Sequence, residues 1–141
     1  MVTALDVKPM ALINKLKEKL KQEIEMPEYV KYVKSGAHAE RVPDQKDFWY
    51  IRCASILYQI YRRHNVGVNR LRRHYGGRKI RGVKPEKHYP ASGSIIRRAM
   101  IALEKAGYIK KTEKGRELTP KGQKLLDTYA KQIINESSNN R

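Results

Sequence analysis

The sequence predicts a mainly α-helical protein with a winged helix-turn-helix core, a small two-stranded β-hairpin as the wing, and additional N-terminal helices. Apolar residues recur at helical spacing in several separate stretches. The stretch Leu103–Asp127 places a helix, a glycine, a short hairpin and a Thr-Pro helix start in the order typical of a winged helix. The 141 residues, of which 40% are hydrophobic, suffice for one domain with a real core.

Two helices are expected before this core. Asp6 is a plausible N-cap for the first, and Pro9 suits a first helical turn. Pro27 ends that helix, and a shorter one follows and closes at Gly36. The apolar stripe is narrow and lacks bulky aromatic anchors, so binding to a membrane surface is disfavoured. The expected apolar positions are Leu12, Ile13, Leu16, Leu20, Ile24, Tyr29, Val30 and Val33.

The clearest helix is expected to follow a loop over residues 37–46, with Asp47 as its cap and its end near Arg63. Its residues divide between two faces. The inward positions are Trp49, Cys53, Ile56, Leu57 and Ile60. The opposite positions are Arg52, Ser55, Gln59, Arg62 and Arg63. One face should therefore anchor the domain while the other presents guanidinium groups.

Glycines and prolines divide the segment that follows. A turn at residues 65–67 leads into a short helical stretch ending near Tyr75. Gly76 and Gly77 break this stretch and supply the backbone freedom of a tight turn. Residues 78–90 contain two prolines, a glycine and little apolar periodicity, so an exposed loop is expected there.

The remaining chain is expected to form a helix, the wing and a closing helix. Ser92 or Ser94 caps the first helix, which Gly107 ends. Strands are expected over residues 108–112 and 116–118, with a turn between them. Thr119 caps the last helix, with Pro120 at its first position. The expected inward positions are Ile95, Ile96, Ala99, Met100, Leu103, Leu125, Leu126, Tyr129 and Ile133.

These elements form one domain over residues 1–136. It consists of an N-terminal helical extension over about 6–35 and a core over about 47–136. Residues 137–141 are expected to be a polar, frayed tail.

Positive charge is concentrated in residues 62–87. This segment holds ten Lys or Arg against one acid, Glu86, which makes +9 of the +17 carried by the whole chain. So dense a positive field repels itself unless a polyanion neutralises it, and phosphate backbones are the commonest polyanion. A solvated basic face is the simpler alternative. The overall balance of 31 basic to 14 acidic residues favours a nucleic acid.

Structured RNA is favoured over an operator DNA as that partner. The basic loop between the second and third core helices is long, whereas a compact DNA reader needs a tight turn there. The N-terminal helices lack a heptad seam for dimerisation. A winged-helix transcription regulator that binds DNA is the alternative. An RNA-cleaving enzyme is disfavoured, because no carboxylate cluster, activated nucleophile or phosphate-cradling glycine loop is present.

Several single residues have competing interpretations. Cys53, the only cysteine, is expected to be a small core residue, and a reducing, cytoplasmic setting is expected. The four scattered histidines have no metal-ligand spacing, so neither a metal nor another cofactor is expected. Tyr75 and Tyr89 either stack on unpaired bases or pack against the domain. Arg97 either contacts a phosphate or pairs with Glu104 on the surface.

Four motifs together allow a comparison with a known family: FWYIRCASILYQIY at 48–61, VGVNRLRRHYGGRKIRG at 66–82, ASGSIIRRAMIALEKAGYI at 91–109 and GRELTPKGQKLLD at 115–127. In their order and spacing the chain resembles the archaeal and eukaryotic-type small-subunit ribosomal protein nineteen (S-nineteen-e) family. Two departures stand out. Cys53 occupies a position that is often alanine, and Tyr58 and Gln59 occupy positions that are often basic, so these two are left out of the binding set.

The resemblance implies a winged-helix fold, a place in the head of the small ribosomal subunit, and direct contact with ribosomal RNA and neighbouring ribosomal proteins. It also implies support of late subunit maturation and of the ribosomal RNA 3′ end. We expect a cytoplasmic protein that is a monomer when free. The expected RNA-binding residues are Arg52, Arg62, Arg63, Arg70, Arg72, Arg73, Arg78, Lys79, Arg81, Lys84, Lys87, Arg97 and Arg98.

Overall fold

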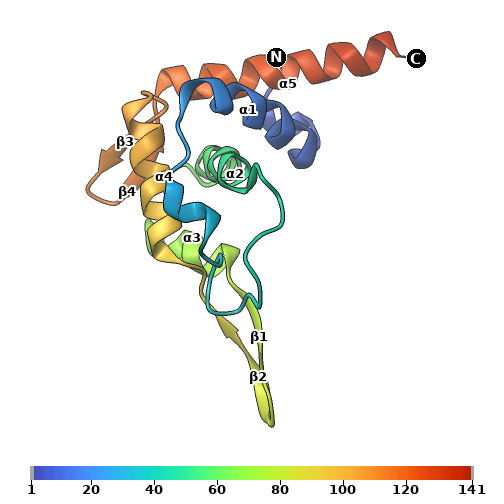
Figure 1. Ribbon diagram of the computed structural model, residues 1–141. Coiled ribbons are helices and arrows are strands. Elements are labelled where there is room, and N and C mark those ends of the chain that lie inside the picture. The colour runs from blue at the N-terminus through green and yellow to red at the C-terminus, as the bar shows by residue number, and fades with distance from the viewer. Residues whose placement is uncertain (1, 141) are drawn as a thin grey trace.

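A computed structural model describes residues 2–140 and confirms the mainly helical, winged-helix class (Figure 1). Two antiparallel hairpins interrupt the helices. The α-helices are α1 (Pro9–Glu23), α2 (Phe48–Arg63), α3 (Val68–Tyr75), α4 (Gly93–Lys105) and α5 (Pro120–Asn139). The strands are β1 (Gly77–Arg81), β2 (Lys84–Tyr89), β3 (Ile109–Thr112) and β4 (Gly115–Leu118). The short 3₁₀ helices are η1 (Ala4–Asp6) and η2 (Glu28–Lys31).

Helix α2 lies at the centre of the core. The five inward positions predicted for it are all fully buried: Trp49, Cys53, Ile56, Leu57 and Ile60. Helices α1, α4 and α5 and strand β4 all pack against α2. Tyr58 and Gln59 are also buried, at 8% and 7% exposure, so the burial extends beyond the predicted face. The interior of the domain is thus organised around one nearly enclosed helix.

The opposite face of α2 differs from the prediction. Gln59 is buried, and the Ser55 hydroxyl lies 2.6 Å from the hydroxyl of Tyr75 on α3. Arg52 lies under the same tyrosine ring. Only the last turn of the helix, with Arg62 exposed and Arg63 half-buried, presents guanidinium groups to solvent. The expectation that the whole face points outward is wrong, because Tyr75 at the end of α3 packs against Arg52 and Ser55.

The N-terminal segment follows the predicted apolar pattern with different boundaries. Pro9 is the first residue of α1, as expected, but Lys8 precedes it as the cap. Asp6 instead belongs to η1, where its carboxylate accepts a hydrogen bond of 2.8 Å from the backbone N–H of Thr3. The second predicted helix is only the single 3₁₀ turn η2, with Val30 buried. Residues 37–46 contain no helix or strand, as predicted.

The winged core closes through backbone pairing. Residues 64–67 connect α2 to α3, and the turn places His64, rather than a glycine, at a positive φ of 69°. Val66 then exchanges two backbone hydrogen bonds with Arg116 of β4, at 3.1 and 2.9 Å. This bridge fastens the wing β3–β4 to the start of α3. The predicted wing strands are correct to within one residue.

Helix α5 begins as predicted and extends further. Thr119 accepts a hydrogen bond from the Gly122 backbone N–H at 3.3 Å and donates one to the Gly107 carbonyl at 2.6 Å. The cap therefore also fixes the end of α4 against the start of α5. The helix continues to Asn139, into the part predicted to fray. Residue 141, the end of the predicted tail, lies outside the described residues.

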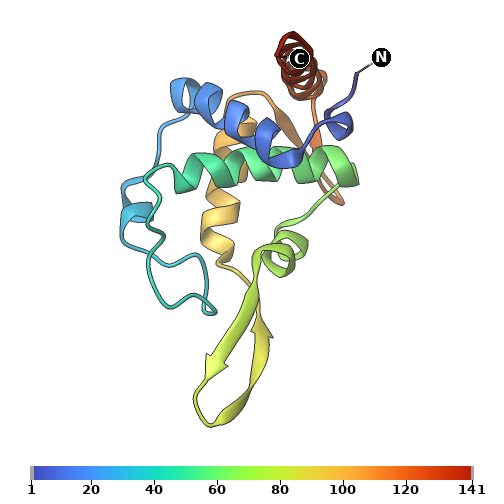
Figure 2. The ribbon, with the colours of Figure 1, turned by 90° about the vertical axis from the view of Figure 1, so that its right-hand side faces the viewer.

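The predicted exposed loop at residues 78–90 is a second hairpin, β1–β2, which projects away from the helices (Figures 1 and 2). It is exposed, but it is not irregular. Arg81 pairs with Lys84 across a two-residue turn whose first residue, Gly82, has a φ of +73°, which is typical of a type II′ turn. A register shift places Ile80 opposite two residues, Pro85 and Glu86, as in a β-bulge.

The central position of α2 leads to a stability prediction. Leu57→Ala and Leu103→Ala each remove a fully buried side chain and should lower the free energy of unfolding by about 2–5 kcal/mol. The control Met10→Ala lies on α1 at 65% exposure and should change it by no more than about 0.5 kcal/mol. Denaturant unfolding measures all three. Equal losses in the control and the core variants would contradict this account of the core.

Candidate nucleic-acid interface

The thirteen basic residues expected to bind RNA lie on four connected elements: helix α2, helix α3, the hairpin β1–β2 and the first turns of α4. The root of the hairpin joins the C-terminal end of α3 to the segment that leads into α4. The end of α3 and the start of α4 therefore both lie at the hairpin root (Figure 2). We call this set of elements the basic region.

Most cations of the basic region lack an acidic partner. Of the thirteen, Arg78 alone forms an ion pair within residues 2–140, with Glu86 of the facing strand. The side chains that are exposed are Arg62, Arg70, Arg73, Arg78, Lys84, Lys87, Arg97 and Arg98. An exposed, unneutralised cluster of this kind attracts a polyanion and releases its counterions on binding.

The lysines of α1 show the opposite arrangement. Lys15 pairs with Glu136 of α5 at 2.5 Å, and Lys21 pairs with Asp47 at 2.7 Å. Lys19 pairs with Glu23 at 3.0 Å. The acids near α1 thus neutralise that side of the molecule, while the basic region stays positive.

Hairpin β1–β2 carries like charges in direct opposition. Lys79 faces Lys87 and Arg81 faces Lys84 in the antiparallel register. Like charges at directly opposed positions destabilise a strand pair. No third strand joins this sheet in the described residues, and an isolated two-stranded hairpin is only marginally stable in water. Bound phosphates would remove this repulsion.

The guanidinium of Arg52 was predicted to face solvent, but in the structure it packs against two aromatic rings. Its Cζ atom lies 3.9 Å from the centre of the Tyr75 ring and 5.2 Å from that of Phe48. Burial lowers the pKa of the guanidinium from its ordinary value, although the nearby Tyr75 opposes this effect. The side chain is half-buried and held by aromatic contacts, so its first role is to fasten α2 to α3.

The two tyrosines of the basic region differ. Tyr75 is packed into the domain, with its hydroxyl at Ser55 and its ring over Arg52 and edge-on to His74 at 4.9 Å. Burial raises the pKa of the Tyr75 hydroxyl. Of the two interpretations of Tyr75, the structure supports packing. Tyr89, at the end of β2, is half-buried with the Lys79 ammonium 5.2 Å from its ring centre.

Arg72 also has a structural contact. Its Nε donates a hydrogen bond of 3.0 Å to the Ala91 carbonyl, and the Ala91 backbone N–H donates one of 2.9 Å to the Arg72 carbonyl. These two bonds connect the last turn of α3 to the residue that follows the hairpin. Arg72 thus sets the position of the hairpin root relative to both helices.

The glycines at the hairpin root are required for close approach rather than for an unusual φ. Gly76 has an ordinary φ of −70°, but a Cβ there would lie 2.3 Å from the Tyr89 carbonyl oxygen. A Cβ at Gly77 would lie 2.8 Å from the His38 ring. As predicted, α3 ends before these two glycines, but they do not form the expected tight turn, because Gly77 already begins strand β1 and neither glycine has a positive φ. They allow the loop at residues 37–46 and the end of β2 to contact the hairpin root.

His38 has no hydrogen-bond partner for its buried Nδ1 among residues 2–140. Burial lowers the pKa of its ring, and the positive charges of Arg52 and His88 lower it further. The neutral imidazole is therefore the form that fits the folded hairpin root.

Arg97 and Arg98 lie on the exposed side of α4. Within the described residues Arg97 forms no ion pair with Glu104, so the alternative of surface pairing is wrong. The Cζ of Arg98 lies 4.4 Å from the ring centre of Tyr29 in η2, which orients that side chain. Sequence reasoning missed three further exposed cations on the wing, Lys110, Lys111 and Lys114, although the lysine-rich turn of the predicted wing could have indicated them.

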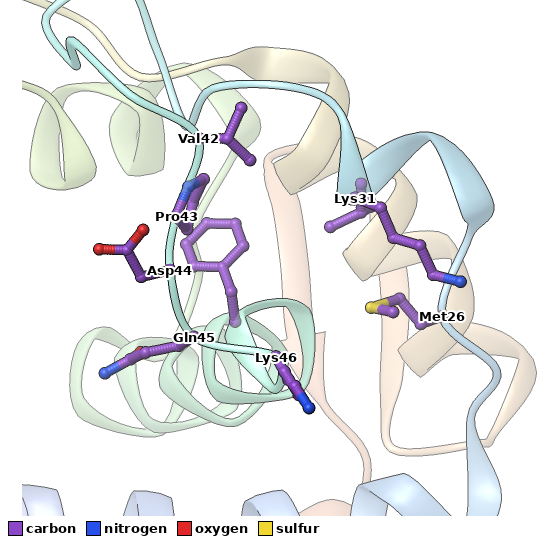
Figure 3. A pocket seen from close by; sticks show the side chains of 9 residues that line it. Met26, Lys31, Val42, Pro43, Asp44, Gln45 and Lys46 are labelled. Carbon is purple, nitrogen blue, oxygen red and sulfur yellow. The ribbon is translucent and has the colours of Figure 1, made fainter.

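A small cavity lies away from the basic region, between η2 and the loop that precedes α2 (Figure 3). Its volume of about 200 Å³ is below the usual range for small-molecule sites. Figure 3 shows Asp44 and Gln45 pointing away from it, so few polar groups converge there. Apolar groups that line it come from Met26, Val30, Val42, Pro43 and Phe48.

Other site types find little support in residues 2–140. No three His, Cys, Asp or Glu side chains there gather closely enough to hold a metal ion. None of the helices formed by these residues is sufficiently long and apolar to cross a bilayer. Cys53 is fully buried, and desolvation raises the pKa of its thiol well above the ordinary value. A buried thiol of this kind is unreactive.

Comparison with known proteins places this architecture in a family. The family model for ribosomal protein S19e matches residues 3–136. The chain belongs to the ribosomal protein S19e family. The match covers the N-terminal helices, the winged core, the basic hairpin and most of α5, so the family resemblance found in the sequence motifs is confirmed.

Curated S19e relatives match this chain over most of its length, at 40–44% identity. The chain is 40% identical to the small ribosomal subunit protein eS19 of Aeropyrum pernix, over 96% of this chain and 92% of the relative. It is 44% identical to that of Thermoplasma acidophilum, over 89% and 85%. It is 41% identical to eS19A of Saccharomyces cerevisiae, over 96% of both chains. Both archaeal and eukaryotic members of the family thus align along nearly their whole length.

The packing of Arg52 predicts a loss of stability that Arg62 does not share. Arg52→Ala should lower the free energy of unfolding by about 1–3 kcal/mol, since it removes both the ring contacts and the packed aliphatic stem. Arg62→Ala, on an exposed helix end, should change it by no more than about 0.5 kcal/mol. Denaturant unfolding of both variants compares them. Equal effects would show that Arg52 does not hold α3 against α2.

The environment of His38 predicts acid sensitivity. Its pKa in the folded chain should lie below the ordinary 6.5, so the unfolded chain binds more protons and stability falls as the pH drops through about 6.5. NMR titration of the ring measures the pKa directly. His38→Gln should lose less stability than the wild type between about pH 7.5 and 5.5. A ring pKa at or above 6.5 would contradict the proposed burial of the neutral imidazole.

Proposed function

We propose that this chain is an RNA-binding structural component of the small ribosomal subunit. The observation that carries the proposal is the basic region, most of whose cations are exposed and almost all of which lack an acidic partner. S19e membership supports it, because the curated relatives in archaea and yeast are named as small ribosomal subunit proteins. The cytoplasm, on the small subunit, is then where the chain works.

The charge distribution supports ribosomal RNA as the partner. Four elements present cations, and the projecting hairpin extends them beyond the helical body (Figure 1). Cations on several sides suit a folded RNA, which presents phosphates from several directions. These contacts position the protein by shape and charge rather than by reading bases.

The hairpin also argues against the DNA-binding alternative. A DNA-reading winged helix places a short turn between the two helices at the major groove. Here that connection is the hairpin β1–β2, which projects from the start of α4. The hairpin would meet the duplex before α4 reached a groove floor.

Assembly and maturation follow from the same contacts. By holding a ribosomal RNA fold, the chain would support small-subunit assembly and the formation of the RNA 3′ end, while other proteins perform the cleavage. Neighbouring proteins of the subunit head would contact surfaces outside the basic region. The free chain would be a monomer.

Charge reversals test this function directly. Arg97→Glu and Arg62→Glu should hinder incorporation into subunits and weaken RNA binding, with a slope of log affinity against log salt that is shallower by about 0.7–0.9 per lost phosphate contact. The control Lys131→Glu makes the same charge change on an exposed site of α5. Filter binding over a salt series and sedimentation of subunits measure the effects.

Thermal unfolding should be nearly unchanged in all three variants, because all three positions are exposed. Salt-independent affinity of the wild type for ribosomal RNA, or its absence from purified small subunits, would overturn the proposal.

A further inference from the structure

The tip of hairpin β1–β2 carries apolar side chains that the fold does not use. Val83 is fully exposed and Ile80 is 64% exposed, although both lie in the most basic part of the chain. Neither belongs to the hydrophobic core or to the residues packed against it. A single exposed apolar residue is ordinary. Two exposed apolar residues within one turn-and-strand segment at the end of a projecting element point to a contact surface.

Turn chemistry does not account for Val83. Gly82 alone supplies the positive φ that the two-residue turn requires. The second turn position needs no apolar group, and glycine followed by serine, asparagine or aspartate is a favoured hairpin turn. Valine is a strand former with a stiff side chain. Its presence at the turn places a rigid apolar group at the furthest point of the hairpin.

The charges around the tip identify its partner. The two opposed cation pairs, Lys79 with Lys87 and Arg81 with Lys84, lie directly behind Val83. A purely apolar partner would leave these cations unneutralised. The groove of a nucleic acid neutralises them with the phosphates along its rims, and the riboses on its floor offer carbon atoms that an apolar side chain can contact.

We propose that hairpin β1–β2 enters the minor groove of a helical segment of ribosomal RNA tip first. The opposed cation pairs contact phosphates on the two rims, while Val83 and Ile80 lie against riboses and base edges. The minor groove of an RNA helix is wide and shallow, so a hairpin can enter it, whereas the major groove is deep and narrow. The inference rests on the proposed RNA-binding function and specifies how one part of the basic region binds.

The bulge supports a role for Ile80 in the same contact. The bulge lies where Ile80 faces Pro85 and Glu86. It interrupts the regular pairing one residue before Arg81, which pairs with Lys84. A bulge increases the twist of a strand pair and redirects a side chain. Ile80 remains 64% exposed there, close behind the tip.

This binding mode has two components that can be measured separately. The cation contacts depend on salt because they release counterions. The contact of Val83 buries apolar surface, so it should not change the salt slope, and it should make the heat capacity of binding more negative.

The test compares three variants in binding to a transcript of the small-subunit ribosomal RNA from the organism that encodes the chain. Val83→Ser should weaken binding about tenfold, leave the salt slope unchanged and make the heat capacity change less negative. Val83→Ile, which keeps an apolar β-branched group, should bind as the wild type does. Met10→Ser removes an exposed apolar side chain from α1 and should have no effect. Since Gly-Ser is a favoured turn, loss of the hairpin would not explain the result.

The outcomes separate this inference from the proposed function. Wild-type affinity in Val83→Ser, together with weakened binding in Arg97→Glu, would overturn the groove contact and leave the RNA-binding function standing. Absence of RNA binding by the wild type would overturn both. A photo-crosslinking residue at position 83 in assembled subunits should attach to ribosomal RNA, and attachment to a neighbouring protein alone would overturn the inference.

Discussion

Helix α2 is enclosed by α1, α4, α5 and strand β4, and its inward side chains are removed from water almost completely. This burial supplies the main favourable contribution to a small domain. It also restricts where charge can go, because an unpaired cation inside such a core would be very costly. The arginines of α2 therefore lie at its exposed end or, as Arg52 does, beneath aromatic rings at its margin. Helices α1, α4 and α5 and strand β4 are positioned by their packing on this helix.

The unpaired positive charge of the chain lies mainly at the margin of the core that surrounds α2. Acidic residues neutralise the lysines of α1, whereas the hairpin, α3 and the start of α4 retain theirs. The hydrogen bonds of Arg72 and the close contacts at Gly76 fix the hairpin root on the helical body. The hairpin thus combines a fixed root with a projecting end whose opposed cations repel one another, and an anion bound between these cations would stabilise it.

Periodicity made most of the fold predictable. The buried stripes of α2 and α4, the wing and the Thr119–Pro120 start of α5 each carry a strong local pattern. The hairpin β1–β2 was missed because both of its faces meet solvent, so alternating apolar residues are not required. Arg52 was misplaced for a different reason. Helical spacing gives the direction of a side chain, but only the tertiary structure shows that Tyr75 returns to cover it.

The two strands of the projecting hairpin each have a free edge, and free edges invite pairing with a second molecule. Lysines and arginines along β1 and β2, the bulge opposite Ile80 and the imide nitrogen of Pro85 all oppose such pairing. The charges that would bind a phosphate backbone therefore also oppose edge-to-edge pairing between two copies of the chain, which is the first step of cross-β aggregation.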